Sequence, residues 1–351
     1  MMTKKTALIA GATGVIGRYL VSHLAKLEDW EVIGVSRKKP ENSDGVRYIE
    51  ADLLQPEELK VKFSDLKHVT HLIYAAYQDH ESDPEQQVAV NLAMFRNVLN
   101  ATEQAAAGLE RVLLMQGAKA YGVHIGPFKT PAQETDPRHM PPNFYYNQED
   151  YMREAQKGKS WSWTILRPDV VCGFSIGNPM NIAMVIGTYA SISKELGLPL
   201  RFPGKAYPYL AQVTDAELLA RCTAWAATEE KCAFETFNVT NGDFFRWENL
   251  WPIIAEHFQM NAASPQPMPL ARVMADKQSL WSEIIDKYHL RPIPYQKLAS
   301  WGFGDFIFNC DYDVMSNTTK LRKFGFHEVQ DSQTMFLRLF AEFKNEKILP
   351  F

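Results

Sequence analysis

The sequence predicts an α/β protein in which a parallel sheet carries helices on both faces. Three observations support this fold class. Strand-like and helix-like patterns alternate through the first half of the 351 residues, and such alternation is typical of parallel sheets. A glycine-rich turn joins the first strand pattern to the first helix pattern. Beyond residue 241 helical patterns dominate, so the C-terminal half is expected to add a smaller, mainly helical cap.

The individual elements follow from the spacing of apolar residues. Short apolar runs are typical of buried strands, and apolar residues three and four positions apart are typical of helices. Strands are expected at residues 6–10, 31–36, 46–51, 71–76, 111–115, 164–167 and 235–239. Helices are expected at residues 17–27, from 56 onward, and at 87–106, 247–258, 271–288 and 333–344. The segments 120–142 and 195–210 are rich in Pro and Gly and are expected to be loops.

These elements divide into two predicted domains. Residues 1–167 together with 211–240 form the nucleotide-binding sheet domain, and residues 168–210 together with 241–351 form the substrate-binding cap. The longest stretch without charge, residues 170–193, contains three glycines and a proline. We therefore expect it to be a turn and a buried helix, and no membrane span.

Composition excludes several classes of protein. The chain has 37 Lys and Arg against 41 Asp and Glu, a net charge of −4, with no basic block, so nucleic-acid binding is not expected. The four cysteines are far apart in the sequence and predict reduced thiols without a metal cluster. No signal peptide is recognised. A cytoplasmic protein, either a monomer or a homodimer, is expected.

The glycine-rich turn predicts a dinucleotide site. Gly11, Gly14 and Gly17 follow an apolar strand at GxxGxxG spacing and open a helical pattern. In such turns the glycines permit the tight bend, the approach of a pyrophosphate and close packing of helix on sheet, and the helix N-terminus favours the phosphates. The other residues of the turn assigned to the cofactor are Thr13, Val15 and Ile16. The fold is therefore predicted to be a Rossmann-type doubly wound sheet.

The end of the second strand favours NADPH as the cofactor. NAD sites usually carry an acidic residue there, about twenty residues beyond the glycines, to bind the ribose hydroxyls. This sequence has Ser36 and Arg37 followed by two lysines. Arg37 is suited to pair with a 2′-phosphate, and Ser36 to donate a hydrogen bond to it.

The usual catalytic pair of short-chain dehydrogenases is missing from the sequence. That pair is a Tyr and a Lys four residues apart on one helix, and none of Tyr121, Tyr145, Tyr146 and Tyr151 has a lysine at this spacing. Lys119 directly follows the fifth strand segment. Because loops after the carboxyl ends of parallel strands line the cofactor crevice, Lys119 is the candidate that replaces the missing lysine.

One segment resembles a known family. Residues 143–150, Asn-Phe-Tyr-Tyr-Asn-Gln-Glu-Asp, are similar to the NFYYxxED motif of the progesterone 5β-reductase and iridoid synthase family, which are atypical extended short-chain dehydrogenases. The resemblance covers nearly the whole chain. Further matching segments are residues 94–99, 126–128, 167–168, 173–175, 237–243 and 301–305.

The resemblance implies NADPH-dependent reduction of the C=C bond of an enone or enal, with hydride delivered to the β-carbon. Tyr145 would hold the carbonyl oxygen, and Lys119 matches the catalytic lysine of the family. A phenol and an ammonium beside the developing enolate charge form an oxyanion-hole arrangement. The other matched positions are Ala75, Gln116, Lys119, Tyr145, Asp52, Leu53, Pro168 and Val171 for the cofactor, and Tyr77, Phe128, Tyr145 and Phe303 for a small apolar substrate.

Two departures from the family pattern fall in the expected pocket. Residues 122–125 lengthen the loop before Gly126-Pro127-Phe128, and Tyr77 stands where relatives often carry tryptophan. The size of the substrate is therefore not implied. Two alternatives to C=C reduction stay open: carbonyl reduction by the same Tyr and Lys, and a cofactor-sensing protein without catalysis. No metal site is expected.

Overall fold

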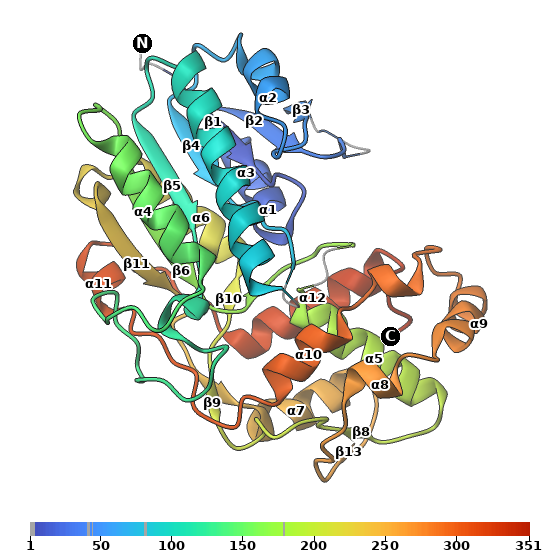
Figure 1. Cartoon of the computed structure of the whole chain (residues 1–351). Coiled ribbons are helices and arrows are strands. Elements are labelled where there is room, and N and C mark those ends of the chain that lie inside the picture. Colours follow the sequence, from blue (N-terminus) through green and yellow to red (C-terminus); the bar gives the residue numbers. More distant parts are fainter. Residues whose placement is uncertain (1–3, 41–42, 44, 81–82, 178–179) are drawn as a thin grey trace.

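The computed structural model of the chain describes residues 4–40, 43, 45–80, 83–177 and 180–351 (Figure 1). Its centre is a seven-stranded parallel sheet with the strand order β11-β6-β5-β4-β1-β2-β3. This order, with β1 flanked by later strands on both sides, is that of a doubly wound sheet. The strands are β1 (Lys5–Ala10), β2 (Trp30–Ser36), β3 (Arg47–Glu50), β4 (His71–Tyr74), β5 (Arg111–Met115), β6 (Ser162–Pro168) and β11 (Glu235–Val239).

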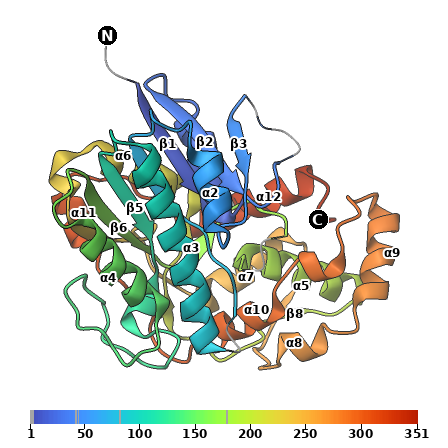
Figure 2. The ribbon, with the colours of Figure 1, turned by 45° about the horizontal axis from the view of Figure 1, so that its top comes forward.

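Helices cover both faces of the sheet. In β1, Ala7 and Ile9 pack into one core cluster, whereas Leu8 and Ala10 pack into the cluster on the other face. A strand that is apolar at every position requires such cover on two sides. The face of Ala7 carries α1 (Val15–Leu24) and α6 (Ala216–Thr228). The face of Leu8, in front of the strands in Figure 2, carries α2 (Pro56–Phe63), α3 (Pro84–Ala105) and α4 (Phe144–Gln156).

A second, mainly helical unit adjoins the carboxyl ends of the strands (Figure 1). Its core is aromatic, with Phe202, Trp247, Trp251 and Phe308 fully buried against one another. Its helices are α5 (Ile182–Glu195), α7 (Trp247–His257), α8 (Leu270–Val273), α9 (Gln278–Tyr288), α10 (Trp301–Phe308) and α12 (Ser332–Asn345). Its short strand pairs are β8 (Leu200–Arg201) with β13 (Ala262–Ala263), and β9 (Leu210–Ala211) with β12 (Phe245–Arg246).

The remaining elements connect the two units or extend the sheet domain. Strands β7 (Val171–Cys172) and β10 (Thr214–Asp215) pair in parallel. They lie in the two segments through which the chain passes between the sheet domain and the cap. Helix α11 (Thr319–Lys323) lies in the C-terminal half, but its Leu321 packs into the sheet-domain core. Three short 3-10 turns are η1 (Ala118–Tyr121), η2 (Glu230–Cys232) and η3 (Tyr295–Lys297).

The structure divides one expected helix into two and adds four helices that were not expected individually: α4, α6, α10 and α11. A single helix was expected over 271–288, but α8 ends at Val273 and α9 begins only at Gln278. The Tyr295 hydroxyl donates to the Met274 carbonyl at 2.7 Å, and the Met274 side chain is buried in the cap core. The turn therefore places both Met274 and the apolar face of α9 against the core.

The four cysteines are buried free thiols. The described part of the chain contains no group of three His, Cys, Asp or Glu side chains placed to hold a metal ion. Within the same residues, no helix is both long enough and apolar enough to cross a membrane.

Candidate active site

A cavity of about 580 Å³ is lined by residues at the carboxyl ends of the sheet strands and by helix α10 of the cap. Ligands of open α/β sheets bind at this position, where the strand order reverses. The predicted residues on its wall are Gly11, Thr13, Gly14, Val15, Ile16, Ser36, Arg37, Asp52, Leu53, Ala75, Tyr77, Gln116, Lys119, Tyr145, Pro168, Val171 and Phe303. The fold thus brings together side chains that are up to about 290 residues apart in the sequence.

Steric limits explain why the turn at the cavity contains glycine. Gly11 has φ +82°, and a Cβ on it would lie 2.8 Å from the backbone of Ala75 and Ala76, so only glycine is accommodated. Gly14 is the N-cap of α1, and the first turn of this helix faces the cavity. Gly17 is buried instead: a Cβ on it would lie 2.1 Å from the Gly11 carbonyl oxygen. Gly17 therefore packs the helix onto the turn and is not among the residues that line the cavity.

The far end of the cavity is formed by the ends of β2 and β3. Arg37 is exposed at the end of β2. Asp52 and Leu53 follow the end of the neighbouring strand β3. The Ser36 hydroxyl donates to the Lys38 carbonyl at 2.7 Å. This hydroxyl is predicted to donate to a 2′-phosphate; in the structure it is bonded to the backbone of the Arg37 turn.

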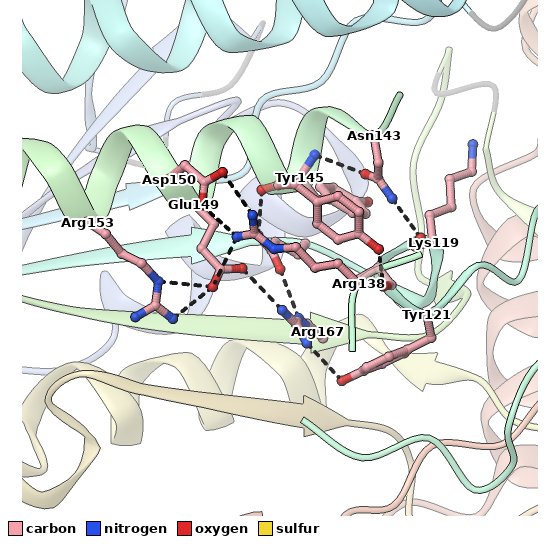
Figure 3. A network of polar contacts seen from close by, with 12 residues as sticks. Lys119, Tyr121, Arg138, Asn143, Tyr145, Glu149, Asp150, Arg153 and Arg167 are labelled. Atoms are coloured by element: carbon pink, nitrogen blue, oxygen red, sulfur yellow. Dashed lines mark hydrogen bonds and ion pairs between the residues drawn. The ribbon is translucent and has the colours of Figure 1, made fainter. Parts of the chain in front are cut away.

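Tyr145 and Lys119 come from different elements and are held together by Asn143 (Figure 3). Tyr145 lies in the first turn of α4, and Lys119 in the turn η1 after β5. The Asn143 side chain caps α4 by accepting from the Tyr145 backbone N–H at 3.1 Å, and its Nδ2 donates to the Lys119 carbonyl at 2.8 Å. The His139 ring nitrogen Nε2 also lies 3.0 Å from that carbonyl. One side chain thus fixes the backbone of both candidate catalytic residues.

Tyr146 adds a second link between α4 and η1. Its hydroxyl donates to the Ala120 carbonyl at 2.7 Å and accepts from the His139 backbone N–H at 3.1 Å. The Gln116 side chain, at the end of β5, donates to the Tyr145 carbonyl at 3.0 Å. Both flanks of Tyr145 are therefore bonded to the segment that carries Lys119.

The acidic end of the motif anchors α4 to the sheet. Glu149 and Arg167 are both about 8% exposed and form an ion pair at 3.2 Å. Arg153 donates to the other Glu149 oxygen at 2.8 Å. Arg167 also donates to Gln116 at 2.9 Å and to the Tyr121 hydroxyl at 3.2 Å. The buried guanidinium is thereby satisfied on three sides, as burial of a charge requires.

Asp150 forms the exposed counterpart of this network. Its two carboxylate oxygens accept from the Arg138 guanidinium at 2.7 and 2.8 Å. The Arg138 guanidinium also lies 4.8 Å from the centre of the Tyr146 ring, in cation–π contact. In the NFYYxxED pattern, Asn143, Tyr146, Glu149 and Asp150 thus hold α4 in place, and the Phe144 ring packs beside that of Tyr145.

The Tyr145 hydroxyl lies against Gly117 and the end of β6. A Cβ built on Gly117 would be 3.2 Å from the hydroxyl oxygen and 3.3 Å from the Pro168 carbonyl oxygen. Tyr145 and Lys119 both line the cavity wall, so a phenol donor and an ammonium face one volume. This pair is suited to stabilise negative charge that develops on an oxygen.

The substrate side of the cavity is aromatic and aliphatic. Tyr77 and Phe303 line it as expected, and the Tyr77 ring lies 5.7 Å from that of Phe144. Phe128 is not among the lining residues; the centre of its ring lies 6.4 Å from that of Tyr312. Lining residues that the sequence analysis did not assign include Gly117, Val123, Phe144, Gln148, Asp169, Phe306 and Ile307.

Some of these omissions had a signal in the sequence. Phe306 and Ile307 lie three and four positions after Phe303 on α10, and this spacing puts them on one helix face. Gln148 lies in the matched motif, and its side chain donates to the Asn91 carbonyl at 2.9 Å. Asp169 had no signal beyond its place after Pro168.

Comparisons with known proteins support the resemblance. A sequence profile described as a PRISE-like Rossmann-fold domain matches residues 48–350. The chain belongs to this family. It is 34% identical to the 3-oxo-Delta(4,5)-steroid 5-beta-reductase of Arabidopsis thaliana, covering 99% of this chain and 94% of the relative. It is 32% identical to the (S)-8-oxocitronellyl enol synthase of Catharanthus roseus, over 99% and 93% of the two chains. It is 34% identical to the short chain dehydrogenase gsfE of Penicillium aethiopicum, over 99% of both chains.

Solved structures confirm the fold of this PRISE-like protein. The UDP-glucose 4-epimerase of Thermus thermophilus, in complex with NAD, superposes with a TM-score of 0.69 at 18% identity, over 96% of this chain and 99% of the epimerase. The UDP-glucose 4-epimerase of Thermotoga maritima gives 0.70 at 17% identity, over 97% and 99%. The prediction of a Rossmann-type fold is confirmed, and so is that of an oxidoreductase of the short-chain dehydrogenase superfamily.

Proposed function

We propose that this protein reduces the C=C bond of α,β-unsaturated ketones and aldehydes with NADPH. The observation that carries the proposal is the placement of Tyr145 and Lys119 on one wall of the cavity, fixed by Asn143 and Tyr146. The cavity also contains the glycine turn and an aromatic end. Relatives named as a steroid 5-beta-reductase and an enol synthase support the same reaction class.

The cavity residues fit a nicotinamide cofactor. The backbone of Ala75 and Ala76 approaches Gly11 too closely for any Cβ, which keeps the turn tight, and the N-terminal turn of α1 faces the cavity. The end of β2 presents the Arg37 guanidinium and no carboxylate, and this favours a 2′-phosphate. When bound, NADPH supplies the hydride for the reduction.

In the proposed reaction the protein acts on the carbonyl end of the substrate. The Tyr145 hydroxyl donates a hydrogen bond to the carbonyl oxygen, and the Lys119 ammonium adds positive charge on the same side. When hydride is added to the β-carbon, negative charge moves onto this oxygen as an enolate. Donors positioned in advance lower the energy of that state more than the energy of the bound enone. A proton from solvent then completes the saturated product at the α-carbon.

A comparison of matched substrates tests the proposal. NADPH absorbance should fall with 2-cyclohexenone, whereas cyclohexanone offers the same oxygen without an electrophilic β-carbon and should only inhibit. Tyr145→Phe should lower kcat by about 10²–10³-fold, the usual loss for one oxyanion donor. Tyr151→Phe is the matched control, because its hydroxyl donates to Asn100 at the protein surface.

Three results would contradict the proposal. Reduction of cyclohexanone at the rate of the enone would favour carbonyl reduction. Cofactor binding without turnover of any enone would favour a sensing protein. Full activity of Tyr145→Phe would remove the assigned role of the phenol.

A further inference from the structure

A second, smaller cavity adjoins the first behind the end of β6. Its volume is about 50 Å³. Five residues line both cavities and so form the wall between them: Val123, Asp169, Val170, Phe306 and Ile307. The rest of its lining comes mainly from the cap, including Trp247, Tyr209, Gln212 and Cys310. We call this volume the side cavity.

Asp169 is the charged residue on that wall, and its burial is unusual. Its side chain is among the buried polar groups, at 5% exposure. Carboxylates are almost never fully buried unless they are paired. Oδ1 accepts from the Val170 backbone N–H at 2.9 Å, but Oδ2 has no hydrogen-bond partner among the described residues. Such an atom is rare in native structures and calls for an explanation. Because Oδ2 itself exposes under 1 Å², a group that completes it must displace part of the wall.

The backbone of Asp169 is rigidly placed. Its N–H donates to the Thr214 hydroxyl at 3.1 Å, and that hydroxyl donates in turn to the Val239 carbonyl at 2.9 Å. The residue lies between β6 and β7 and is bonded to β10 through Thr214. Pro168, its neighbour in sequence, lies beside the Tyr145 hydroxyl across Gly117.

We propose that Asp169 binds a hydroxyl group on the far end of the substrate, with that end of the substrate entering the side cavity. This proposal rests on the proposed function and specifies its substrate class as enones or enals that carry a hydroxyl group. The side cavity is large enough only for a small group of this kind. The surrounding aliphatic and aromatic wall would exclude water from the hydrogen bond.

The chemistry of Asp169 favours a hydroxyl over other oxygen groups. Burial raises the pKa of Asp169 to about 7, so its protonated form persists to a higher pH than that of an ordinary carboxyl. A hydroxyl accepts from the protonated carboxyl and donates to the carboxylate, whereas a carbonyl only accepts. A hydroxyl is therefore the partner that satisfies Asp169 in both states.

The test compares substrate pairs in three proteins. Linear 2-enals of increasing length are each paired with the analogue that carries a terminal hydroxyl, and kcat/KM is measured with NADPH for both. The proteins are the parent, Asp169→Leu, which has a similar volume and no polar atom, and Asp169→Asn, whose amide still donates and accepts. Binding of NADPH to each protein is measured separately.

The expected result is a preference of the parent for the hydroxylated enal at one chain length. Asp169→Leu should lower the ratio of the two kcat/KM values by about tenfold or more, which corresponds to about 1.4 kcal/mol, and Asp169→Asn by less than about threefold. An unchanged ratio in Asp169→Leu would overturn the proposal, because water alone would then complete the carboxyl. If both variants bind NADPH more weakly and the ratio of the two kcat/KM values is unchanged, Asp169 contacts the cofactor and not the substrate, and the proposal is wrong. If the parent reduces neither enal of any pair nor simple enones, the proposed function itself fails.

Discussion

Adding a single methyl group at Gly117 should disturb the candidate catalytic tyrosine without touching its side chain. The Cβ of Gly117→Ala would lie 3.2 Å from the Tyr145 hydroxyl oxygen and 3.3 Å from the Pro168 carbonyl oxygen. Both separations are shorter than an ordinary van der Waals contact of carbon and oxygen. Gly117 itself has an extended backbone, with φ 179°, which alanine adopts without strain. The perturbation is therefore a displacement of the hydroxyl by a few tenths of an ångström.

The size of the effect follows from this displacement. A misplacement of about 1 Å costs about 10²-fold in rate when orientation matters. A shift of a few tenths should thus lower kcat with 2-cyclohexenone by about threefold to tenfold at saturating NADPH. The melting temperature should change little, because Gly117 lies on the cavity wall and neither contact is with the packed core.

Two controls make this prediction refutable. Gly108→Ala adds the same methyl group where nothing lies within 4 Å and should leave kcat unchanged. In a Tyr145→Phe background the effect of Gly117→Ala should largely vanish, because the oxygen it displaces is gone. A parental kcat in a folded Gly117→Ala protein, or an undiminished effect in the double variant, would refute the placement of Tyr145 at the reacting oxygen.

Three further predictions concern the cofactor, the network and the buried carboxyl. Arg37→Ala should weaken NADPH binding by about 1.5–3 kcal/mol and leave NADH binding nearly unchanged, measured by fluorescence titration; equal losses would show that Arg37 does not contact the 2′-phosphate. Glu149→Gln should lower the free energy of unfolding by about 3–5 kcal/mol in urea titrations, because Arg167 is left buried without its partner. The control Asp150→Asn breaks only an exposed pair and should cost under about 1 kcal/mol. Asp169 binds its proton more tightly when folded, with its pKa raised from 3.8 to about 7, so the parent should lose stability relative to Asp169→Asn as pH rises from about 4 to 7, by at most about 4 kcal/mol. A difference that is independent of pH would contradict the burial of an unpartnered carboxyl.

Much of the fold could be predicted from local sequence. The apolar runs of β1, β2 and β5 are buried on both faces, so their composition alone marks them as central parallel strands. The glycine turn could also be predicted, since the positive φ of Gly11 and the nearby backbone leave no room for a side chain. The break between α8 and α9 was not predicted; the hydroxyl bonded to the Met274 carbonyl in this break comes from Tyr295, a residue distant in sequence.

The candidate site was predictable only where a motif marked it. Tyr145 was found through the family pattern and Lys119 from its place after the fifth strand. The roles of Asn143, Tyr146 and Glu149 depend on bonds to η1 and β6 that the sequence does not show. Asp169 was missed because its burial results from the packing of the cap on the strand end. Phe128 was assigned to the substrate, but its position depends on the course of the longer loop.

The central claim is that hydride is added to carbon and not to the carbonyl group. The most direct measurement uses NADPH deuterated at both C4 positions with 2-cyclohexenone, followed by NMR of the product. If Tyr145 holds the carbonyl oxygen as an enolate forms, deuterium should appear at the β-carbon of cyclohexanone, and solvent should supply the proton at the α-carbon. Deuterium at the carbinol carbon of 2-cyclohexenol, with the double bond intact, would contradict the account.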